Sequence, residues 1–448
     1  MNSSKAFFYA IDTVHKLPLP NAVMARARQS LLDYLAVACA GAKFQEERME
    51  KYFAFAEPEA GQFKAIGTGK NVALKEAVFL NGLNGHALDF DDGTNSGIIH
   101  LGSPIFSLLL PLAQRYAISI EGVLKAAVIG YETSYTMAVS IQPGHKALGY
   151  HATGTCGVLG ATIAASYMLG FSEEERFQAF ATACVSASGM LKVLDDGSEL
   201  KPYNVAKSAL LALTSIQLAK AGFKGHPDPL GGYRGFFKMM TGREDIKLKP
   251  ALLNETYAIM KSYTKPYASC RYTHPAVEAA INLRNQYSLK TEDIKKIIIR
   301  TYDLAVAGHE HTIIAGSYSA KMSIPFSTAV GLIYGKAGLQ EFSEEIVKDD
   351  KVLALTKRIH VIPDTELSQK FPAVQAAIVE IRTGDSVFSK RIDFPKGEPE
   401  NPLTAKEFFN RYTNLMNYAG IAADVSSVIY ETVFCKTDAK VSGILKNL

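Results

Sequence analysis

The sequence predicts a mainly helical protein with a smaller α+β part, and three features of the chain support this fold class. Apolar residues recur at helical spacing through most of the first 290 residues. β-branched runs and a turn then alternate with shorter helical patterns. After a Pro- and Gly-rich linker at 395–402, a helical pattern returns and continues to the last residue. A chain of 448 residues is too long for one small core, which favours two domains or one large domain with an insertion.

The helical part can be divided by its start and stop signals. Residues 21–40 have apolar residues at helical spacing and precede Gly41, a residue type that commonly ends helices. Ser103 and Pro104 have the residue types of an N-cap and a first helical position, before an apolar helix at 105–117. Further helices are expected over 75–88, 120–141, 154–169, 176–191 and 204–221.

The α+β part begins with a β-branched run. Residues 295–302 (KKIIIRTY) are typical of a strand, and 373–382 with 387–394 form a predicted hairpin around the turn sequence TGDS. Two helices are expected between these strands, over 323–334 and 343–355. Strands and helices in this order predict a compact α+β unit.

The composition restricts the class of partner. Apolar content of 48% and charged content of 21% are ordinary for a globular protein, and the net charge of +4 is not concentrated in a basic run. The most apolar run, 105–113, is far shorter than the ~20 residues that span a bilayer. The N-terminus lacks the pattern of a signal peptide, and the five cysteines are scattered. We therefore expect a cytoplasmic protein with no nucleic-acid or membrane partner, and a small anionic substrate is compatible with its charge.

One stretch, 81–104, concentrates acid and base residues immediately before the apolar helix. A dense group of carboxylates and imidazoles beside a hydrophobic element is typical of perturbed pKa values and of catalysis. The alternative is a solvated acidic loop that follows a helix end. The residues concerned are His86, Asp89, Asp91, Asp92 and His100.

Four motifs give the chain a family resemblance. They are HALDFDD followed by a His and a Ser-Pro, GYHATGTCGVLGA at 149–161, LKPYNVAK at 200–207 and KPYASCRYTHPAVEAA at 265–280. In this order and at this spacing they resemble the MmgE/PrpD family. Its characterised members include 2-methylcitrate dehydratase, cis-aconitate decarboxylase and iminodisuccinate epimerase.

The resemblance implies a domain layout and an assembly. The large helical domain would comprise residues 1–265 and 400–448, and an α/β lid domain would comprise 266–399. Members of the family are typically homodimers and need no metal or organic cofactor, so we expect a homodimer, no metal site and no cofactor here.

The resemblance also implies catalytic residues. His100 would be a general acid or base, and Asp89 would orient an imidazole, because contact with a carboxylate fixes the tautomer and raises basicity. His151 precedes a Gly-rich helix start, where backbone N–H groups favour an anion. Lys201 would bind a substrate carboxylate, although a lone lysine before a proline is usually a solvated loop residue.

Further candidates follow from the last motif. Arg271 and Lys265 would bind carboxylates, for which arginine offers a bidentate fork, and His274 would be a further catalytic residue. Two positions depart from the decarboxylase pattern and are candidate substrate contacts. Thr94 comes one residue late, since DFDDT is here DFDDGTN, and Phe326 stands where cis-aconitate decarboxylases carry an active-site tyrosine. The loss of a phenol, which is a proton donor, disfavours decarboxylation.

Dehydration, decarboxylation and epimerisation of a polycarboxylate share one requirement. Each moves a proton at a carbon next to a carboxylate, which needs an acid or base and cations that absorb negative charge. We therefore expect a cofactor-independent enzyme acting on a small di- or tricarboxylate, with a lyase of the dehydratase type first. The alternatives are an epimerase of an iminodisuccinate-like dicarboxylate, a cis-aconitate decarboxylase and a non-catalytic dimer that binds a metabolite.

Overall fold

The computed structural model describes residues 2–193, 198–254, 256–436 and 438–448. The chain divides into two compact units, which we call the helical unit and the α/β unit. The helical unit comprises the described residues within 1–192, 200–262 and 406–448, and the α/β unit those within 193–199 and 263–405. A large helical part with a smaller α/β part confirms the predicted fold class.

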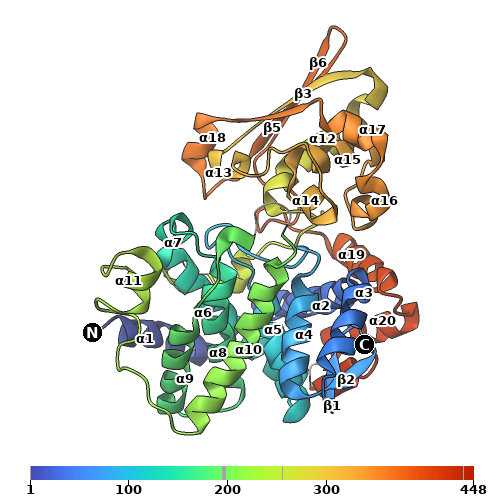
Figure 1. Cartoon of the computed structure of the whole chain (residues 1–448). Helices are drawn as coiled ribbons and strands as arrows, with labels where there is room; N and C mark the ends of the chain where they lie inside the picture. Colours follow the sequence, from blue (N-terminus) through green and yellow to red (C-terminus); the bar gives the residue numbers. More distant parts are fainter. Residues whose placement is uncertain (1, 194–197, 255, 437) are drawn as a thin grey trace. The chain divides into compact units, whose positions relative to one another are not determined.

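The described part of the helical unit contains long and short helices and one short hairpin (Figure 1). Its elements are α1 Ser3–Lys16, α2 Asn21–Phe44, α3 Glu46–Ala56, β1 Ala60–Ala65, β2 Lys70–Val72, α4 Leu74–His86, α5 Gly102–Arg115, α6 Ile120–Ile141, α7 Gly144–Ala147, α8 Ala152–Met168, α9 Glu173–Ser186, α10 Lys201–Lys220, α11 Phe236–Thr241, α19 Ala405–Tyr418, α20 Ala423–Cys435 and α21 Val441–Leu445. Within the described residues, no helix is both long and apolar enough to span a membrane.

Four helices of this unit, α4, α5, α8 and α10, pack against one another. The last turn of α4 meets the first turn of α5, because Ser103 donates a hydrogen bond to the carbonyl of Gly85. The start of α10 meets the start of α8, because the hydroxyl of Ser208 donates to the carbonyls of Thr153 and Gly154. One end of this four-helix group therefore collects the C-terminus of α4 and the N-termini of the other three.

Gly41 does not end its helix, contrary to the prediction. Helix α2 continues to Phe44, and Gly41 instead lies where α2 crosses α4. A Cβ atom at Gly41 would lie 2.0 Å from the carbonyl oxygen of Asn84, a distance that no side chain can tolerate. The glycine is therefore required by the close approach of two helices and not by a helix end.

The start of α5 also differs from the prediction. The helix begins at Gly102, and Ser103 is its second residue, not its N-cap. The hydroxyl of Ser103 donates to Asp91 and to Gly85, so this side chain stabilises the preceding loop instead of capping the helix.

The α/β unit contains a four-stranded sheet of order β4-β3-β5-β6 (Figure 1). Strand β3 is parallel to β4 and antiparallel to β5, and β5 and β6 form the predicted hairpin. Helix α12 packs on β5 and β6. The elements of the unit are α12 His274–Tyr287, β3 Ile294–Thr301, α13 Asp303–Val306, α14 Ser317–Met322, α15 Ile324–Tyr334, α16 Glu344–Val347, α17 Asp350–Thr356, β4 Ile359–Pro363, α18 Thr365–Lys370, β5 Ala377–Thr383 and β6 Ser386–Ile392.

The helix predicted over 343–355 is two helices, α16 and α17. Asp349 separates them, because its side chain accepts hydrogen bonds from the backbone N–H groups of Lys351 and Val352 and so caps a new helix. Strand β4, with its sequence IHVIP, was not among the predicted strands.

Candidate active site

The loop between α4 and α5 carries the acidic residues, and its first carboxylate forms an ion pair with α10. Asp89 Oδ1 lies 2.6 Å from Nζ of Lys201, and both residues are buried. Asp89 has a φ of 50°, in the left-handed region that aspartate tolerates better than most non-glycine residues. The pair holds the acidic loop against the first residue of α10.

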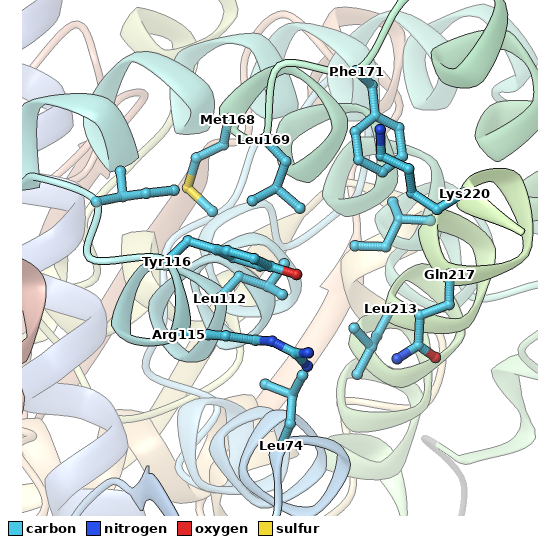
Figure 2. A pocket seen from close by; sticks show the side chains of 12 residues that line it. Leu74, Leu112, Arg115, Tyr116, Met168, Leu169, Phe171, Leu213, Gln217 and Lys220 are labelled. Carbon is cyan, nitrogen blue, oxygen red and sulfur yellow. The ribbon is translucent and has the colours of Figure 1, made fainter.

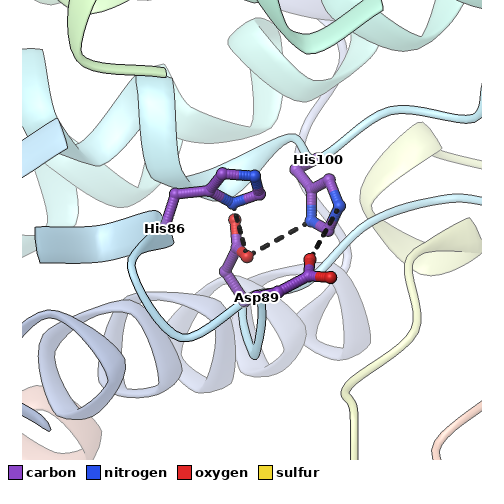
Figure 3. A group of neighbouring side chains, drawn as sticks. His86, Asp89 and His100 are labelled. Atoms are coloured by element: carbon purple, nitrogen blue, oxygen red, sulfur yellow. Dashed lines mark hydrogen bonds and ion pairs between the residues drawn. The ribbon is translucent and has the colours of Figure 1, made fainter. Parts of the chain in front are cut away.

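Asp91 lies between the imidazoles of His86 and His100. Figure 3 shows these two rings beside Asp89. Its Oδ1 is 2.8 Å from Nδ1 of His86 and 3.3 Å from Nδ1 of His100, and its Oδ2 accepts a hydrogen bond from Ser103 at 2.8 Å. Burial raises the pKa of Asp91, but the charges of His100 and His86 and their hydrogen bonds outweigh burial and hold the pKa well below its usual value. Asp91 is therefore a carboxylate at neutral pH, and it makes shorter contacts to imidazoles than Asp89 does.

The surroundings of His100 fix the position of its ring proton. Nδ1 lies 2.9 Å from the backbone carbonyl of Asp92 and 3.3 Å from the carboxylate of Asp91, and both groups are acceptors. Nδ1 therefore carries a hydrogen, and any proton exchanged with a substrate is exchanged at Nε2. Nε2 lies 3.6 Å from Asp89 Oδ1, where a carboxylate stabilises the imidazolium form.

His151, the N-cap of α8, has the opposite arrangement. The side-chain amide of Asn204 donates to Nδ1 of His151 at 3.1 Å. The ammonium of Lys207 lies 3.3 Å from Oδ1 of Asn204, which orients the amide with its NH2 group toward His151. Nδ1 is thus an acceptor, and the hydrogen of the neutral ring is on Nε2.

Electrostatics keep His151 neutral. Burial lowers its pKa first; the positive charge of Lys201 lowers it further, to well below the usual value, and the imidazolium forms of His86 and His100 act in the same direction. The opposing effect of Asp89 is smaller. His151 is therefore a neutral hydrogen-bond donor that lies near the charged groups of this cluster.

Asp92 supports the loop from the other side. Its carboxylate accepts hydrogen bonds from the backbone N–H of Gly102 at 2.9 Å and from the hydroxyl of Tyr131. Burial raises the pKa of Asp92 to about 6, although both hydrogen bonds oppose the rise. These bonds connect the loop to the start of α5 and to α6.

A second support comes from the C-terminal helices. Arg411, on α19, forms an ion pair with Asp33 of α2 and donates a hydrogen bond to the carbonyl of Phe90 at 2.7 Å. Its guanidinium also lies over the ring of Phe90, 4.3 Å from the centroid. Asp33, Tyr131 and Arg411 are far apart along the chain, so no local sequence pattern marks them as partners of this loop. Asn204 lies within the motif LKPYNVAK and was not among the predicted site residues, although that motif could have indicated it.

Four residues of this cluster could hold a metal ion. Ligand atoms from His86, Asp89, Asp91 and His100 lie within 4.8 Å of one another, and imidazoles with carboxylates suit a divalent transition metal. A cation at Asp89 would compete with the ammonium of Lys201, which already lies 2.6 Å away. The donor set therefore fits a metal only if that ion pair opens.

Thr94 lies in the same loop, between the acidic residues and His100. It is buried, forms a backbone bridge with Ile99, and its hydroxyl is 3.3 Å from that of Ser96. These contacts close a tight turn in the loop before His100. A contact between Thr94 and substrate stays a prediction.

The other predicted residues belong to the α/β unit. Arg271 is buried and forms an ion pair with Glu398, and His274 Nε2 lies 3.2 Å from the carbonyl of Ser269. Lys265 is buried as well. Phe326 is fully buried, with its ring 6.0 Å from that of Phe342. The helical unit alone brings together Asp89, His100, His151 and Lys201, and roles in catalysis for these α/β-unit residues stay predictions.

Comparison with known proteins matches this chain in both parts. The MmgE/PrpD N-terminal domain matches residues 9–249 and the MmgE/PrpD C-terminal domain matches residues 267–431. Cis-aconitate decarboxylase of Aspergillus terreus is 25% identical over 437 residues, which cover 92% of this chain and 88% of the relative.

Two further relatives have lower identity. Cis-aconitate decarboxylase of Mus musculus is 22% identical over 414 residues, covering 88% of this chain and 82% of the relative. A mitochondrial 2-methylcitrate dehydratase of Yarrowia lipolytica is 22% identical over 281 residues, covering 56% and 51%. The matches to both family domains confirm the resemblance of the four motifs, and the chain belongs to the MmgE/PrpD family.

Proposed function

We propose that the chain is a cofactor-independent lyase of the dehydratase type that acts on a small di- or tricarboxylate. One observation carries the proposal: two imidazoles lie beside an ammonium and carry their ring hydrogens on different nitrogens, Nδ1 in His100 and Nε2 in His151. His100 exchanges protons at Nε2, His151 donates from Nε2, and Lys201 supplies a positive charge. Proton abstraction next to a carboxylate needs these three functions.

The proposed reaction begins at His100. Its Nε2 takes the proton from the carbon next to a substrate carboxylate, so that the C–H bond breaks and an N–H bond forms. The electron pair moves onto the carboxylate oxygens, where the ammonium of Lys201 and the Nε2–H of His151 stabilise the added charge. Asp89 and Asp91 stabilise the imidazolium that forms.

The leaving group departs in the next step. The electron pair forms a carbon–carbon double bond as the C–O bond to the neighbouring hydroxyl breaks. The imidazolium of His100 gives its proton to the departing oxygen, and water is released. His100 is thereby returned to its neutral form, so the step needs no co-reactant.

Decarboxylation is the second candidate, and the comparisons favour it. The relatives named cis-aconitate decarboxylase align over 92% and 88% of this chain. Against it, Phe326 occupies the position at which we expect a decarboxylase to carry a tyrosine. The same imidazoles and ammonium would serve either reaction, so the substrate and its product must distinguish the two.

Proton NMR in D2O, with EDTA present, tests the proposal on 2-methylcitrate, citrate, cis-aconitate and iminodisuccinate separately. New olefinic signals from a hydroxy acid are expected for a dehydratase, and itaconate from cis-aconitate would identify the decarboxylase. Deuterium incorporation into an intact skeleton would identify an epimerase.

Variants separate an enzyme from a metabolite-binding dimer. His100→Gln and His151→Gln are expected to lose at least 100-fold in turnover while the far-UV circular dichroism is unchanged. His226→Gln is the matched control, because His226 is exposed and outside the cluster. If both cluster variants kept the turnover of the control, the proposed acid and base roles would be wrong.

A further inference from the structure

The other end of the four-helix group contains a cavity. A cavity of about 450 Å³ lies among the N-terminus of α4 and the C-terminal ends of α5, α8 and α10 (Figure 2). These are the ends opposite to those that carry the acid and base residues. At 1.5 Å per residue, helices of 14 to 20 residues place the two sites ~20 to 30 Å apart.

The walls of the cavity are apolar. Leu112, Leu213 and Phe171 are buried residues that line it, together with Leu74 and Ile216. A volume of this size is in the ordinary range for a small-molecule site. A di- or tricarboxylate would lose its hydration against such walls, so this cavity does not suit the proposed substrate.

Polar groups at the rim have no assigned role. The guanidinium of Arg115, the hydroxyl of Tyr116 and the amide of Gln217 lie around the same space (Figure 2). All three side chains are exposed, and none makes a hydrogen bond or ion pair to another residue within the described parts of the chain, so in the free protein their polar groups are hydrated. Arg115 contacts the ring of Tyr116 at 5.4 Å but has no carboxylate partner among those residues.

The charge at the rim selects the head group. Lys220 is already paired with Glu175 at 2.7 Å and lies over the ring of Phe171, so its charge is compensated. Arg115 is left as one uncompensated cation, which matches a singly charged anion better than a phosphate dianion. A guanidinium binds a carboxylate through two parallel hydrogen bonds.

We propose that this cavity binds an amphipathic monocarboxylate of medium chain length, with the carboxylate on Arg115 and the alkyl chain between α5 and α10. Tyr116 and Gln217 would donate further hydrogen bonds to the carboxylate. The apolar tail would displace water from the walls, which favours binding because apolar surface is removed from water. This site is separate from the acid and base cluster and does not depend on the proposed lyase activity.

Isothermal titration calorimetry of the full chain with sodium octanoate tests the site. We expect saturable binding of one octanoate per chain, and no competition by succinate, which has no alkyl tail. Arg115→Gln is expected to weaken binding at least fivefold, and Gln217→Trp, which places an indole at the rim, to weaken it similarly. Lys224→Gln removes an exposed cation outside the cavity and is expected to change nothing. Arg115→Gln should keep its turnover, which shows that it is folded.

Three results would overturn the proposal. Equal affinity of octanoate for the wild type and Arg115→Gln would remove the role of the guanidinium. Equal binding of octylammonium would show that the anion is irrelevant. The third result combines two measurements: octanoate gives no heat of binding, and sedimentation shows a wild-type dimer that dissociates in the Gln217→Trp variant. Together these would assign this face to contact with a second copy of the chain.

Discussion

The ammonium of Lys201 lies 2.6 Å from Oδ1 of Asp89, a carboxylate 112 positions earlier in the chain. The contact joins the first residue of α10 to a loop residue that has a left-handed backbone conformation. Both partners are buried, and attraction between buried charges is screened much less than at the surface. The ion pair therefore serves structure and charge together, because it fixes the loop and keeps a cation beside the imidazoles.

A double-mutant cycle measures this coupling. Lys201→Met leaves the Asp89 carboxylate buried without its ammonium, so we expect a loss of about 3 kcal/mol in the free energy of unfolding. Asp89→Asn keeps the shape and the tolerance for a positive φ. The double variant is expected to be more stable than the sum of the single losses predicts, by about 1 to 3 kcal/mol in urea unfolding.

The exposed pair Lys125 and Glu121, at 2.7 Å on α6, is the matched control for that cycle. Because both side chains are solvated, its coupling should be no more than about 0.5 kcal/mol. If the coupling energy of Asp89 with Lys201 were no larger than that of Glu121 with Lys125, the buried pair would not be less screened than the exposed one. Turnover should fall at least 100-fold in both cluster variants and in neither control variant.

The tautomer of His151 should depend on Asn204. Asn204→Asp replaces the donor to Nδ1 by an acceptor, so the ring proton is expected to move from Nε2 to Nδ1. We expect kcat to fall by about 10- to 100-fold, as for other residues that orient a histidine. The ring nitrogen shifts in 15N NMR report the tautomer directly. The control is Tyr203→Phe, a conservative change one residue before Asn204, which should leave kcat and the 15N shifts unchanged. A normal kcat in Asn204→Asp would refute the role of Asn204.

Asp92 should make stability depend on pH with a defined sign. Its folded pKa of about 6 is above the ordinary value of 3.8, so between these values the folded state binds more protons than the unfolded state. Its contribution is therefore fully present below 3.8 and is lost as the pH rises through 6. The stability of Asp92→Asn relative to the wild type is expected to increase by up to about 3 kcal/mol between pH 4 and pH 7.

Urea unfolding at several pH values between 4 and 7.5 checks this expectation. Asp385→Asn, in the exposed hairpin turn between β5 and β6, is the control, and its curve should run parallel to that of the wild type. A parallel curve for Asp92→Asn would mean that the carboxyl of Asp92 titrates normally despite its burial.

Local patterns predict much of this fold because helices are defined by nearby residues. The apolar run at 120–141 predicts a helix with the bounds of α6, since its small and apolar residues suit a fully buried helix. Gly41 shows the limit of this reasoning. A glycine that permits a close helix crossing and one that ends a helix are identical in sequence, and only the neighbour Asn84 distinguishes them.

In the candidate site, too, some residues could be predicted from a local pattern and others could not. His86, Asp91 and His100 lie within one loop and its flanks, so their density along the chain predicts a cluster. The residues that support them come from elsewhere: Tyr131 from α6 and Arg411 from α19. In the sequence Arg411 follows Glu407 by four residues, a spacing common for arginines on exposed helix surfaces, whereas its buried partner, Asp33, is 378 positions away.

Arg411 offers the sharpest test of how the acidic loop is held. Arg411→Met removes the hydrogen bond to the Phe90 carbonyl and leaves Asp33 buried without its guanidinium. Loss of one partner of a buried ion pair costs about 3 to 5 kcal/mol, so we expect a large drop in the free energy of unfolding at pH 7.5.

The cost should be smaller at pH 5. Burial already raises the pKa of Asp33, and the charge of Arg411 opposes that rise. Without Arg411 the pKa rises further, so the carboxyl takes up a proton and no buried charge remains. Adding Asp33→Asn to Arg411→Met should recover part of the stability at pH 7.5 but none of the turnover, because the amide does not restore the bond to Phe90. Arg234→Met, at an exposed arginine, is the control; if Arg411→Met kept wild-type turnover, the loop would not need the α19 contact for catalysis.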